Sequence, residues 1–207
     1  MKLQVALDLV DIEEAIEIAK KSVSGGVDWI EAGTPLIKNE GMEVVKVLKD
    51  TFPDKVIVAD LKTMDTGFLE VELAAKKGAD VVSILGIADD ATIKGAVRAG
   101  DKYHVDIMAD LIGVDNLGDR AKQLEDLGVD YVLVHTGIDQ QKKGQSPLDS
   151  LKEVSDKINI PFAVAGGLDK GSIDKVKEMG AEVAIVGSSI TSADDPKEAC
   201  EELKLEC

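Results

Sequence analysis

The sequence is poor in several residue types on which whole classes of protein depend. Its two cysteines, Cys200 and Cys207, both lie near the C-terminal end of the 207 residues. They cannot hold a fold together, and a reducing, cytoplasmic setting is therefore the default expectation. One Trp, two Tyr and three Phe are too few to build a platform on which nucleic-acid bases stack.

Basic residues and long apolar runs are also scarce. Lys and Arg number 24 against 40 Asp and Glu, which gives a net charge of −16. Binding to nucleic acid or to an anionic membrane relies on a basic surface, so neither partner is expected. No apolar stretch approaches the ~20 residues of a membrane span, and Met1 to Val5 lack the apolar core of a secretory signal.

Apolar residues recur in short runs from end to end and make up 44% of the chain. The length suits one globular domain over residues 1–207. Within it one sequence motif recurs: a helix-like stretch, a Gly, a small apolar residue, an acid and a β-rich run. The four copies begin at Gly26, Gly78, Gly128 and Gly180, at spacings of 52, 50 and 52 residues. A period of about 50 residues is too long for one βα unit and fits two.

The repeat therefore predicts eight strands that alternate with eight helices. Strands are expected at residues 3–8, 29–31, 56–60, 81–84, 104–110, 131–135, 161–165 and 183–186. Helices are expected at residues 12–23, 42–48, 68–75, 91–97, 117–127, 148–158, 173–179 and 196–203. This alternation is typical of a (β/α)8 TIM barrel. An open doubly wound sheet is the alternative, but no Gly-x-Gly-x-x-Gly follows the first strand.

The first helix illustrates the amphipathic pattern behind these expectations. Ile12, Ala15, Ile16, Ala19 and Val23 fall on one stripe, which is predicted to be the buried face. The charged residues of the segment fall outside that stripe and are predicted to face solvent.

Ionisable residues end many of the predicted strands, and in a barrel the chemistry gathers at those ends. Five of the eight predicted strands end in such a residue, namely Asp8, Glu31, Asp60, Asp110 and His135. A single Asp at such a place is more often a helix cap or loop residue. Burying several ionisable groups at one mouth costs free energy unless they are paired or bind a metal, so their convergence predicts an active site.

The densest cluster is Asp60-Leu61-Lys62-Thr63-Met64-Asp65. Strand alternation predicts Asp60 and Lys62 on one face, where Lys62 could stabilise a developing oxyanion; a surface ion network is the alternative. Glu31 and Asp60 suit a hard divalent ion such as Mg²⁺. The alternative for Glu31 is that Lys62 relieves the repulsion between its carboxylate and that of Asp60, without a metal. His135 could be a general acid or base, whereas His104, at the far rim, is expected to be structural.

Two glycine-containing turns follow the last two strands. Gly166-Gly167 and Gly187-Ser188 let backbone N–H groups approach an anion, and the next helix adds its positive end. Barrels often hold a phosphate at this place. Two tight turns that need a positive φ are the alternative.

The motif Asp60-x-Lys62-x-x-Asp65 resembles the signature of the orotidine 5′-monophosphate decarboxylase suprafamily. The resemblance covers essentially the whole chain and is strongest to the 3-hexulose-6-phosphate synthases, at segments such as residues 3–8, 30–35, 134–141, 163–167 and 185–191. It implies a ribulose-phosphate-binding type of TIM barrel. The implied reaction joins formaldehyde to D-ribulose 5-phosphate reversibly, giving D-arabino-hex-3-ulose 6-phosphate through a metal-bound enediolate. The implied cofactor is Mg²⁺, with Mn²⁺ as a possible substitute.

The resemblance also implies a role for each motif residue. Glu31 and Asp60 would hold the metal, and Lys62 would stabilise the enediolate oxygen. His135 would take the C1 proton, with Asp110 nearby. The implied substrate-binding residues are Asp8 for the hydroxyls and Gly166, Gly167, Gly187 and Ser188 for the phosphate. Asp65 would reach into the site of a partner subunit, which implies an obligate homodimer with shared active sites.

Two other functions remain open from the sequence. The first is that of 3-keto-L-gulonate-6-phosphate decarboxylase, which shares the fold, the metal and most of these residues. Ile138 and Ser188 stand where that decarboxylase has arginines, and an uncharged side chain cannot replace a guanidinium group. The second is a non-catalytic barrel that binds a sugar phosphate. That reading is less favoured because an inert barrel would be expected to lose the acids, Lys62 or His135.

Overall fold

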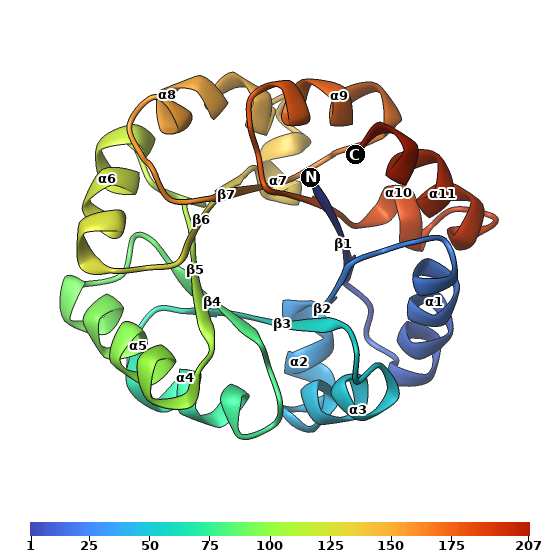
Figure 1. Ribbon diagram of the computed structural model, residues 1–207, viewed down its shortest axis with the longest axis horizontal. Coiled ribbons are helices and arrows are strands. Elements are labelled where there is room, and N and C mark those ends of the chain that lie inside the picture. The colour runs from blue at the N-terminus through green and yellow to red at the C-terminus, as the bar shows by residue number, and fades with distance from the viewer.

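The computed structural model describes residues 1–207, in which helices and strands alternate along the chain (Figure 1). The strands are β1 (Lys2–Leu7), β2 (Trp29–Ala32), β3 (Val56–Thr63), β4 (Val81–Leu85), β5 (Asp106–Asp110), β6 (Tyr131–His135), β7 (Phe162–Ala165) and β8 (Val183–Val186). The helices are α1 (Ile12–Ser24), α2 (Thr34–Glu40), α3 (Glu43–Thr51), α4 (Gly67–Ala75), α5 (Asp90–Tyr103), α6 (Leu117–Leu127), α7 (Ile138–Gln141), α8 (Leu151–Ser155), α9 (Lys170–Glu178), α10 (Ser188–Thr191) and α11 (Pro196–Glu206), with a short 3₁₀ helix at Pro147–Asp149. None of the helices combines the length and apolarity needed to cross a membrane.

The eight strands are all parallel and pair in chain order around a closed barrel. The barrel closes because β1 pairs with β2 on one side, as Gln4 with Trp29, and with β8 on the other, as Val5 with Val186. The longer helices form a ring outside the strands (Figure 1). The predicted (β/α)8 TIM barrel is confirmed, and the open sheet is excluded.

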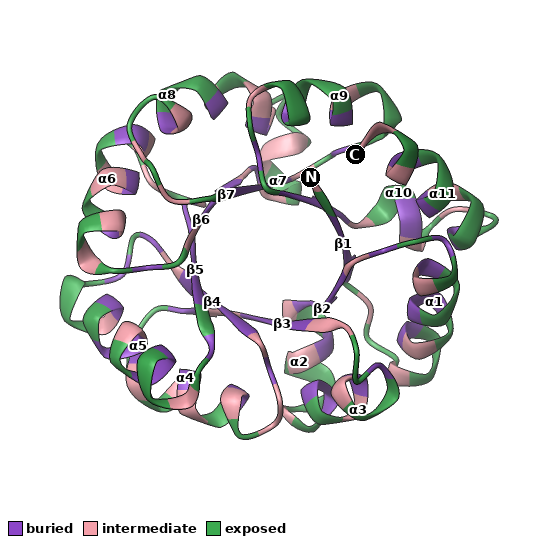
Figure 2. Ribbon diagram, viewed as in Figure 1, coloured by how far each residue is buried: buried purple, intermediate pink, exposed green.

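Apolar side chains fill both sides of the strand wall. The strands are coloured as buried over most of their length (Figure 2). The larger cluster has 47 buried residues and lies between the strands and the outer helices. A second cluster of 10 residues fills the inside of the barrel, where the rings of Trp29 and Tyr131 meet edge to face at 5.7 Å. Filling by side chains is what makes such a barrel a packed core rather than a pore. This interior cluster provides the floor on which the candidate site rests.

The structure explains why the Gly-x-acid motif recurs. Its four glycines adopt φ of 96°, 91°, 93° and 85°, which ends each preceding helix in a conformation that other residues resist. The acids that follow then bind the neighbouring odd-numbered strand. Asp28, Asp80 and Asp130 accept hydrogen bonds of 2.8 Å from the N–H groups of Leu3, Ile57 and Ile107. The repeat therefore fixes where even and odd strands meet.

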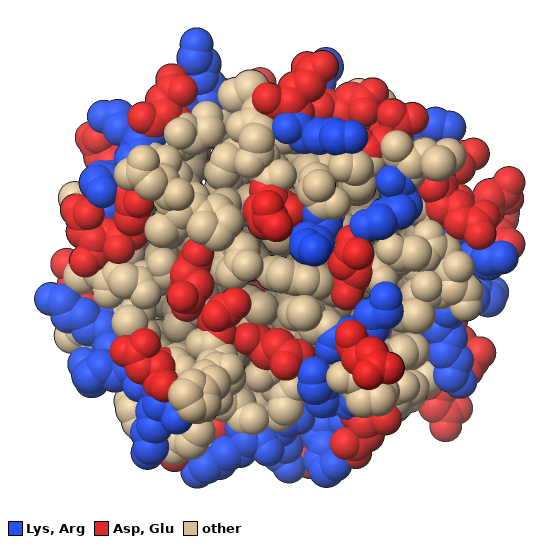
Figure 3. Space-filling model, viewed as in Figure 1, with Lys and Arg blue, Asp and Glu red and all other residues tan.

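These acids also concentrate negative charge at the end of the barrel where the strands begin. Figure 1 looks onto that end, and Figure 3 shows acidic side chains gathered around the centre of the same face. Burial, Asp130 and Asp80 raise the pKa of Asp106 at the start of β5. The acidic composition is thus partly concentrated at the end of the barrel opposite the candidate site.

Several predicted elements differ from those observed. No sequence pattern predicts α2, α7 and α10, which are helices of four to seven residues. The helix predicted at 148–158 is only Leu151–Ser155, because a 3₁₀ turn precedes it. His104 does not lie in a strand; it ends α5 in a left-handed conformation with φ 58°, and β5 begins two residues later.

The predicted stripe of α1 faces the core, because Ile12, Ile16 and Val23 are half-buried against it. Ala15 and Ala19 are buried as expected, and the other two buried positions are Ile18 and Ser22. The hydroxyl of Ser22 donates a hydrogen bond to the carbonyl of Ile18, which satisfies it inside the interface. The buried face is rotated toward this pair because α1 packs against α11 as well as against the barrel.

Candidate active site

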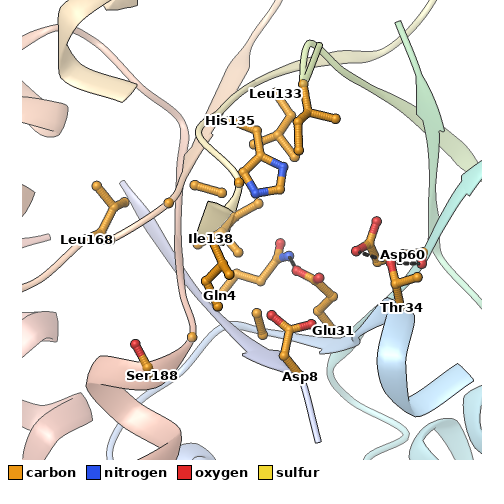
Figure 4. Close-up of a pocket in the computed structure, with 18 of the residues that line it drawn as sticks. Gln4, Asp8, Glu31, Thr34, Asp60, Leu133, His135, Ile138, Leu168 and Ser188 are labelled. Carbon is orange, nitrogen blue, oxygen red and sulfur yellow. Dashed lines mark hydrogen bonds between the residues drawn. The ribbon is translucent and has the colours of Figure 1, made fainter. Parts of the chain in front are cut away.

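A cavity of about 650 Å³ opens at the end of the barrel where the strands finish. Nine of the predicted site residues line it: Asp8, Glu31, Asp60, Lys62, His135, Gly166, Gly167, Gly187 and Ser188. Apolar side chains of the barrel interior, among them Val58, Met108 and Ile185, form its floor. Figure 4 shows the acids and His135 around one space. Strand ends far apart in the sequence therefore build a single site.

Asp60 and Lys62 form an ion pair with 2.7 Å between Nζ and Oδ2. Strand alternation alone does not produce it, because β3 continues to Thr63 through a register irregularity and Lys62 has a left-handed φ of 48°. Only 8% of the Asp60 side chain and 27% of the Lys62 side chain are exposed. A surface ion network is therefore excluded.

The carboxylate of Asp60 is held at both oxygens. Oδ1 accepts a hydrogen bond from the hydroxyl of Ser83, and Oδ2 lies 2.8 Å from the hydroxyl of Thr34. Burial opposes ionisation of Asp60, but Lys62 and these hydrogen bonds outweigh it, so its pKa lies below the ordinary value. Burial also opposes the charge of Lys62, whereas Asp60 and Asp110 raise its pKa above the usual range. The pair is thus fully ionised at neutral pH.

Asp110 lies behind the cavity wall and links two groups that line it. Its side chain is fully buried, with Oδ2 2.7 Å from Nδ1 of His135 and 3.4 Å from Nζ of Lys62. The other oxygen accepts a hydrogen bond from the N–H of Ile112. When Nδ1–H donates to Asp110, the second ring nitrogen of His135 is left free to accept a proton.

Glu31 lies at the centre of the site beside two other acids. Burial, followed by the charges of Asp60 and Asp8, raises its pKa well above the ordinary value. Burial and Asp60 also raise the pKa of Asp8. The single hydrogen bond to the Glu31 carboxylate comes from Nε2 of Gln4 (Figure 4). The raised pKa values mean that the cations of the protein do not fully offset the burial and mutual repulsion of these acids.

A divalent cation fits this set of donors. Glu31, Asp60 and Asp8 present only oxygen atoms, which Mg²⁺ and Mn²⁺ prefer. No three Asp, Glu, His or Cys side chains form a complete metal-binding cluster. Mg²⁺ usually keeps several waters or substrate oxygens and needs only one or two carboxylates. Glu31 and Asp60 would therefore hold such an ion together with ligands from outside the protein.

The glycine-containing turns border the opposite side of the cavity. Gly166 has φ 112°, and a Cβ there would lie 2.2 Å from the carbonyl oxygen of Thr136. The turn itself therefore requires glycine at Gly166, as the tight-turn alternative predicts. Gly187 has φ −98° and does not follow that alternative. Gly187 and Ser188 form the start of α10. The hydroxyl of Ser189 in this helix donates a hydrogen bond to the carbonyl of Leu168. The turns after β7 and β8 are thereby tied together beside the cavity.

Asp65 differs from the other predicted residues because it neither lines the cavity of its own chain nor bonds to a residue that does. It is exposed on the loop after β3, where Oδ1 accepts a hydrogen bond from the N–H of Thr66. Its neighbours Met64, Leu69 and Leu73 are 54%, 51% and 47% exposed. Three large apolar side chains on one loop and helix form a surface suited to contact with another protein.

Three residues of the site were missed by the sequence reasoning. Gln4 and Ser83 lie inside β1 and β4 rather than at their ends. Both are polar residues in apolar strands, so the alternation rule could have found them. Thr34 follows β2 and reaches Asp60 on the neighbouring strand β3, a contact for which the sequence holds no local signal.

The comparisons with known proteins agree with this geometry. A sequence model described as the Orotidine 5′-phosphate decarboxylase / HUMPS family matches residues 1–203. The 3-hexulose-6-phosphate synthase of Mycobacterium gastri is 46% identical over 204 residues, which covers 99% of this chain and 98% of the relative.

Solved structures show the same relationship. A crystal structure of 3-hexulose-6-phosphate synthase superposes with a TM-score of 0.95 at 46% identity, covering 100% of this chain and 99% of the other. A 3-keto-L-gulonate-6-phosphate decarboxylase from Vibrio cholerae O1 biovar El Tor gives 0.88 at 27% identity, covering 99% and 96%. The chain therefore belongs to the Orotidine 5′-phosphate decarboxylase / HUMPS family, and within it to the 3-hexulose-6-phosphate synthases.

Proposed function

We propose that the chain catalyses the reversible condensation of formaldehyde with D-ribulose 5-phosphate to D-arabino-hex-3-ulose 6-phosphate. The observation that carries the proposal is the hydrogen-bonded chain from Asp60 through Lys62 and Asp110 to His135. It puts a fixed cation and a group able to accept a proton beside one cavity. Those are the two functions needed to form an enediolate and to stabilise it.

His135 is the proposed base. Asp110 orients its ring through Nδ1, so the second nitrogen can remove a proton from C1 of the pentulose. The electron pair left on C1 forms the new bond to the carbon of formaldehyde. The formaldehyde oxygen then takes up a proton, which protonated His135 can return.

Lys62 and the acids have complementary roles. The Lys62 ammonium stays protonated because Asp60 and Asp110 raise its pKa, so it can stabilise the negative oxygen of the enediolate. When bound by Glu31 and Asp60, Mg²⁺ or Mn²⁺ would supply Lewis-acid stabilisation of the sugar oxygens. Asp8 would orient hydroxyl groups of the substrate. Gly166, Gly167, Gly187 and Ser188 would bind its phosphate.

We also propose an obligate homodimer that works in the cytoplasm. Asp65 lies outside the cavity of its own chain, which supports a role for it in a neighbouring subunit. The exposed Met64, Leu69 and Leu73 around it give that subunit an apolar surface to cover. Two free cysteines agree with a reducing compartment.

The proposal predicts metal-dependent consumption of formaldehyde when D-ribulose 5-phosphate and Mg²⁺ are present. The rate should fall to background in EDTA and return on addition of excess Mg²⁺. CO₂ release from 3-keto-L-gulonate 6-phosphate, measured in parallel, tests the decarboxylase alternative. Decarboxylation without formaldehyde consumption would contradict the proposed substrate. Binding of the pentulose phosphate with neither reaction would instead indicate a non-catalytic barrel.

A further inference from the structure

Gln4 is a polar residue in the middle of the buried strand β1. Its side chain is fully buried, and Nε2 donates a hydrogen bond of 2.5 Å to Oε2 of Glu31. Its Oε1 is the one buried side-chain oxygen or nitrogen in the chain that has no hydrogen-bond partner. Gln4 also lines the cavity, and its amide reaches Glu31 across the space between β1 and β2 (Figure 4).

Packing does not account for a glutamine at this position. A buried amide oxygen without a partner destabilises the folded protein, whereas an apolar side chain of similar size would not. Such a group in a native structure needs a specific explanation. Among the polar side chains that line the cavity, Glu31, Asp8 and Asp60 can only accept hydrogen bonds once they are ionised to hold a cation. The donors Thr34, Lys62 and Ser83 bond to Asp60 instead. A donor for Oε1 must then come from a bound ligand.

We propose that Gln4 is a positioning residue that holds the Glu31 carboxylate through Nε2, while its Oε1 accepts a hydrogen bond from a hydroxyl group of the bound sugar phosphate. A neutral amide fixes one carboxylate oxygen and leaves the charge of Glu31 available to a cation. A hydroxyl-rich ligand supplies the missing O–H donor. This inference deepens the proposed function and rests on it, since it takes Glu31 as a ligand of the cation.

The first test measures binding of Mn²⁺ alone by electron paramagnetic resonance, without substrate. Gln4→Met keeps the volume and removes both hydrogen bonds. The variant should bind Mn²⁺ about tenfold more weakly, as expected when the group that orients a metal ligand is removed. In a Glu31→Gln background the same change should alter the affinity for Mn²⁺ by less than about twofold. Gln4 acts on the cation through the Glu31 carboxylate, so its effect should disappear when that carboxylate is absent.

The second test measures binding of D-ribulose 5-phosphate by calorimetry in EDTA, so that no cation takes part. Gln4→Met should weaken binding by about two- to tenfold, the range expected for one lost hydrogen bond. The loss should persist in the Glu31→Gln background, because Oε1 acts on the sugar directly. Unchanged affinity would overturn the acceptor role.

Leu3→Met is the matched control. Leu3 is the preceding residue of β1, is equally buried and packs toward the outer helices, so this change disturbs the strand without touching the cavity. It should leave both affinities unchanged. If Gln4→Met does not fold, Gln4→Asn replaces it in both tests. Asn keeps the amide but shortens the side chain by one methylene, so it should weaken binding of both Mn²⁺ and D-ribulose 5-phosphate.

The outcomes separate the inference from the function beneath it. Wild-type affinity for Mn²⁺ in Gln4→Met, together with weakened affinity in Glu31→Gln, would overturn the positioning role alone. Unchanged Mn²⁺ binding in Glu31→Gln would overturn the role of Glu31 as a metal ligand and the positioning role with it. The calorimetric test in EDTA would still decide the contact between Gln4 and the sugar.

Discussion

Glu31 carries its carboxyl group in a buried position between two other acids. Burial is the largest cause of its raised pKa, and the charges of Asp60 and Asp8 add to it. In the metal-free folded protein the group therefore keeps its proton at pH values where the unfolded chain, near 4.5, has released it. Since the folded state binds more protons, the stability contributed by this group is present below pH 4.5. It is lost as the pH rises through the folded-state pKa.

Glu31→Gln should therefore stabilise the metal-free protein at pH 8 and have little effect at pH 4. A glutamine keeps the shape and the acceptor for Gln4, but it carries no charge to bury. Differential scanning calorimetry in EDTA at the two pH values measures the difference in Tm. Glu178→Gln, at an exposed position, removes the same charge from the surface as a control. A Tm difference that is equal at both pH values would mean that packing, not ionisation, is responsible.

The strands are aligned by side chains as well as by backbone pairing. Asp130 lies just before β6, and its N–H donates to the carbonyl of Ile107 while its carboxylate accepts from the N–H of the same residue. Asp80 and Asp28 repeat this pair of bonds at Ile57 and Leu3. In the fourth copy only the backbone bond from Glu182 to Phe162 is present. Three of the four repeats thus use a carboxylate to join neighbouring strands.

Asp130→Ala should lower the free energy of unfolding by about 1 kcal/mol, because it removes a hydrogen bond to a charged acceptor at a partly solvated site. Urea unfolding followed by circular dichroism measures the change. Asp126→Ala provides the comparison, since Asp126 is exposed on α6 and pairs only with Lys122. That surface pair should change the stability by less than about 0.5 kcal/mol. Equal losses in the two variants would contradict a role in strand alignment.

The elements also show what a single sequence can and cannot predict. The barrel followed from a period of about 50 residues and from runs of β-branched residues, because these patterns reflect burial that every strand shares. The helices α7 and α10 have four residues each, too few for a 3.6-residue period to appear. Lys62 was expected near Asp60, but the irregular β3 backbone that brings them together depends on pairing with β4. Thr34 reaches Asp60 only through tertiary packing.

At the scale of the whole molecule, one chain builds nearly all of the candidate site but leaves one predicted residue outside it. Asp65 lies on the loop after β3, next to exposed apolar side chains of that loop and of α4. A second copy that packs there would cover the apolar surface and bring its own Asp65 to this subunit. Isologous contact of this kind would give two equivalent sites per dimer.

Shared sites predict that two inactive variants restore each other. A heterodimer of an Asp65→Ala chain with an Asp60→Ala chain has one site in which every proposed residue is present. It should show about half of the wild-type activity, since one of its two sites is intact. Two affinity tags allow the heterodimer to be purified, and formaldehyde consumption measures its activity. Light scattering on each parent checks that both variants remain dimers.

The matched control carries both substitutions on one chain and pairs it with a wild-type chain. With shared sites this heterodimer has no complete site, because the wild-type cavity faces Ala at position 65 of its partner. It should therefore be nearly inactive, although it contains the same substitutions as the active combination. If each subunit builds its own site, the results reverse. The doubly substituted chain then leaves about half of the activity with its wild-type partner, and the two single variants remain inactive together. The pair of heterodimers thus distinguishes a site completed across the interface from a dimer that only brings two independent barrels together.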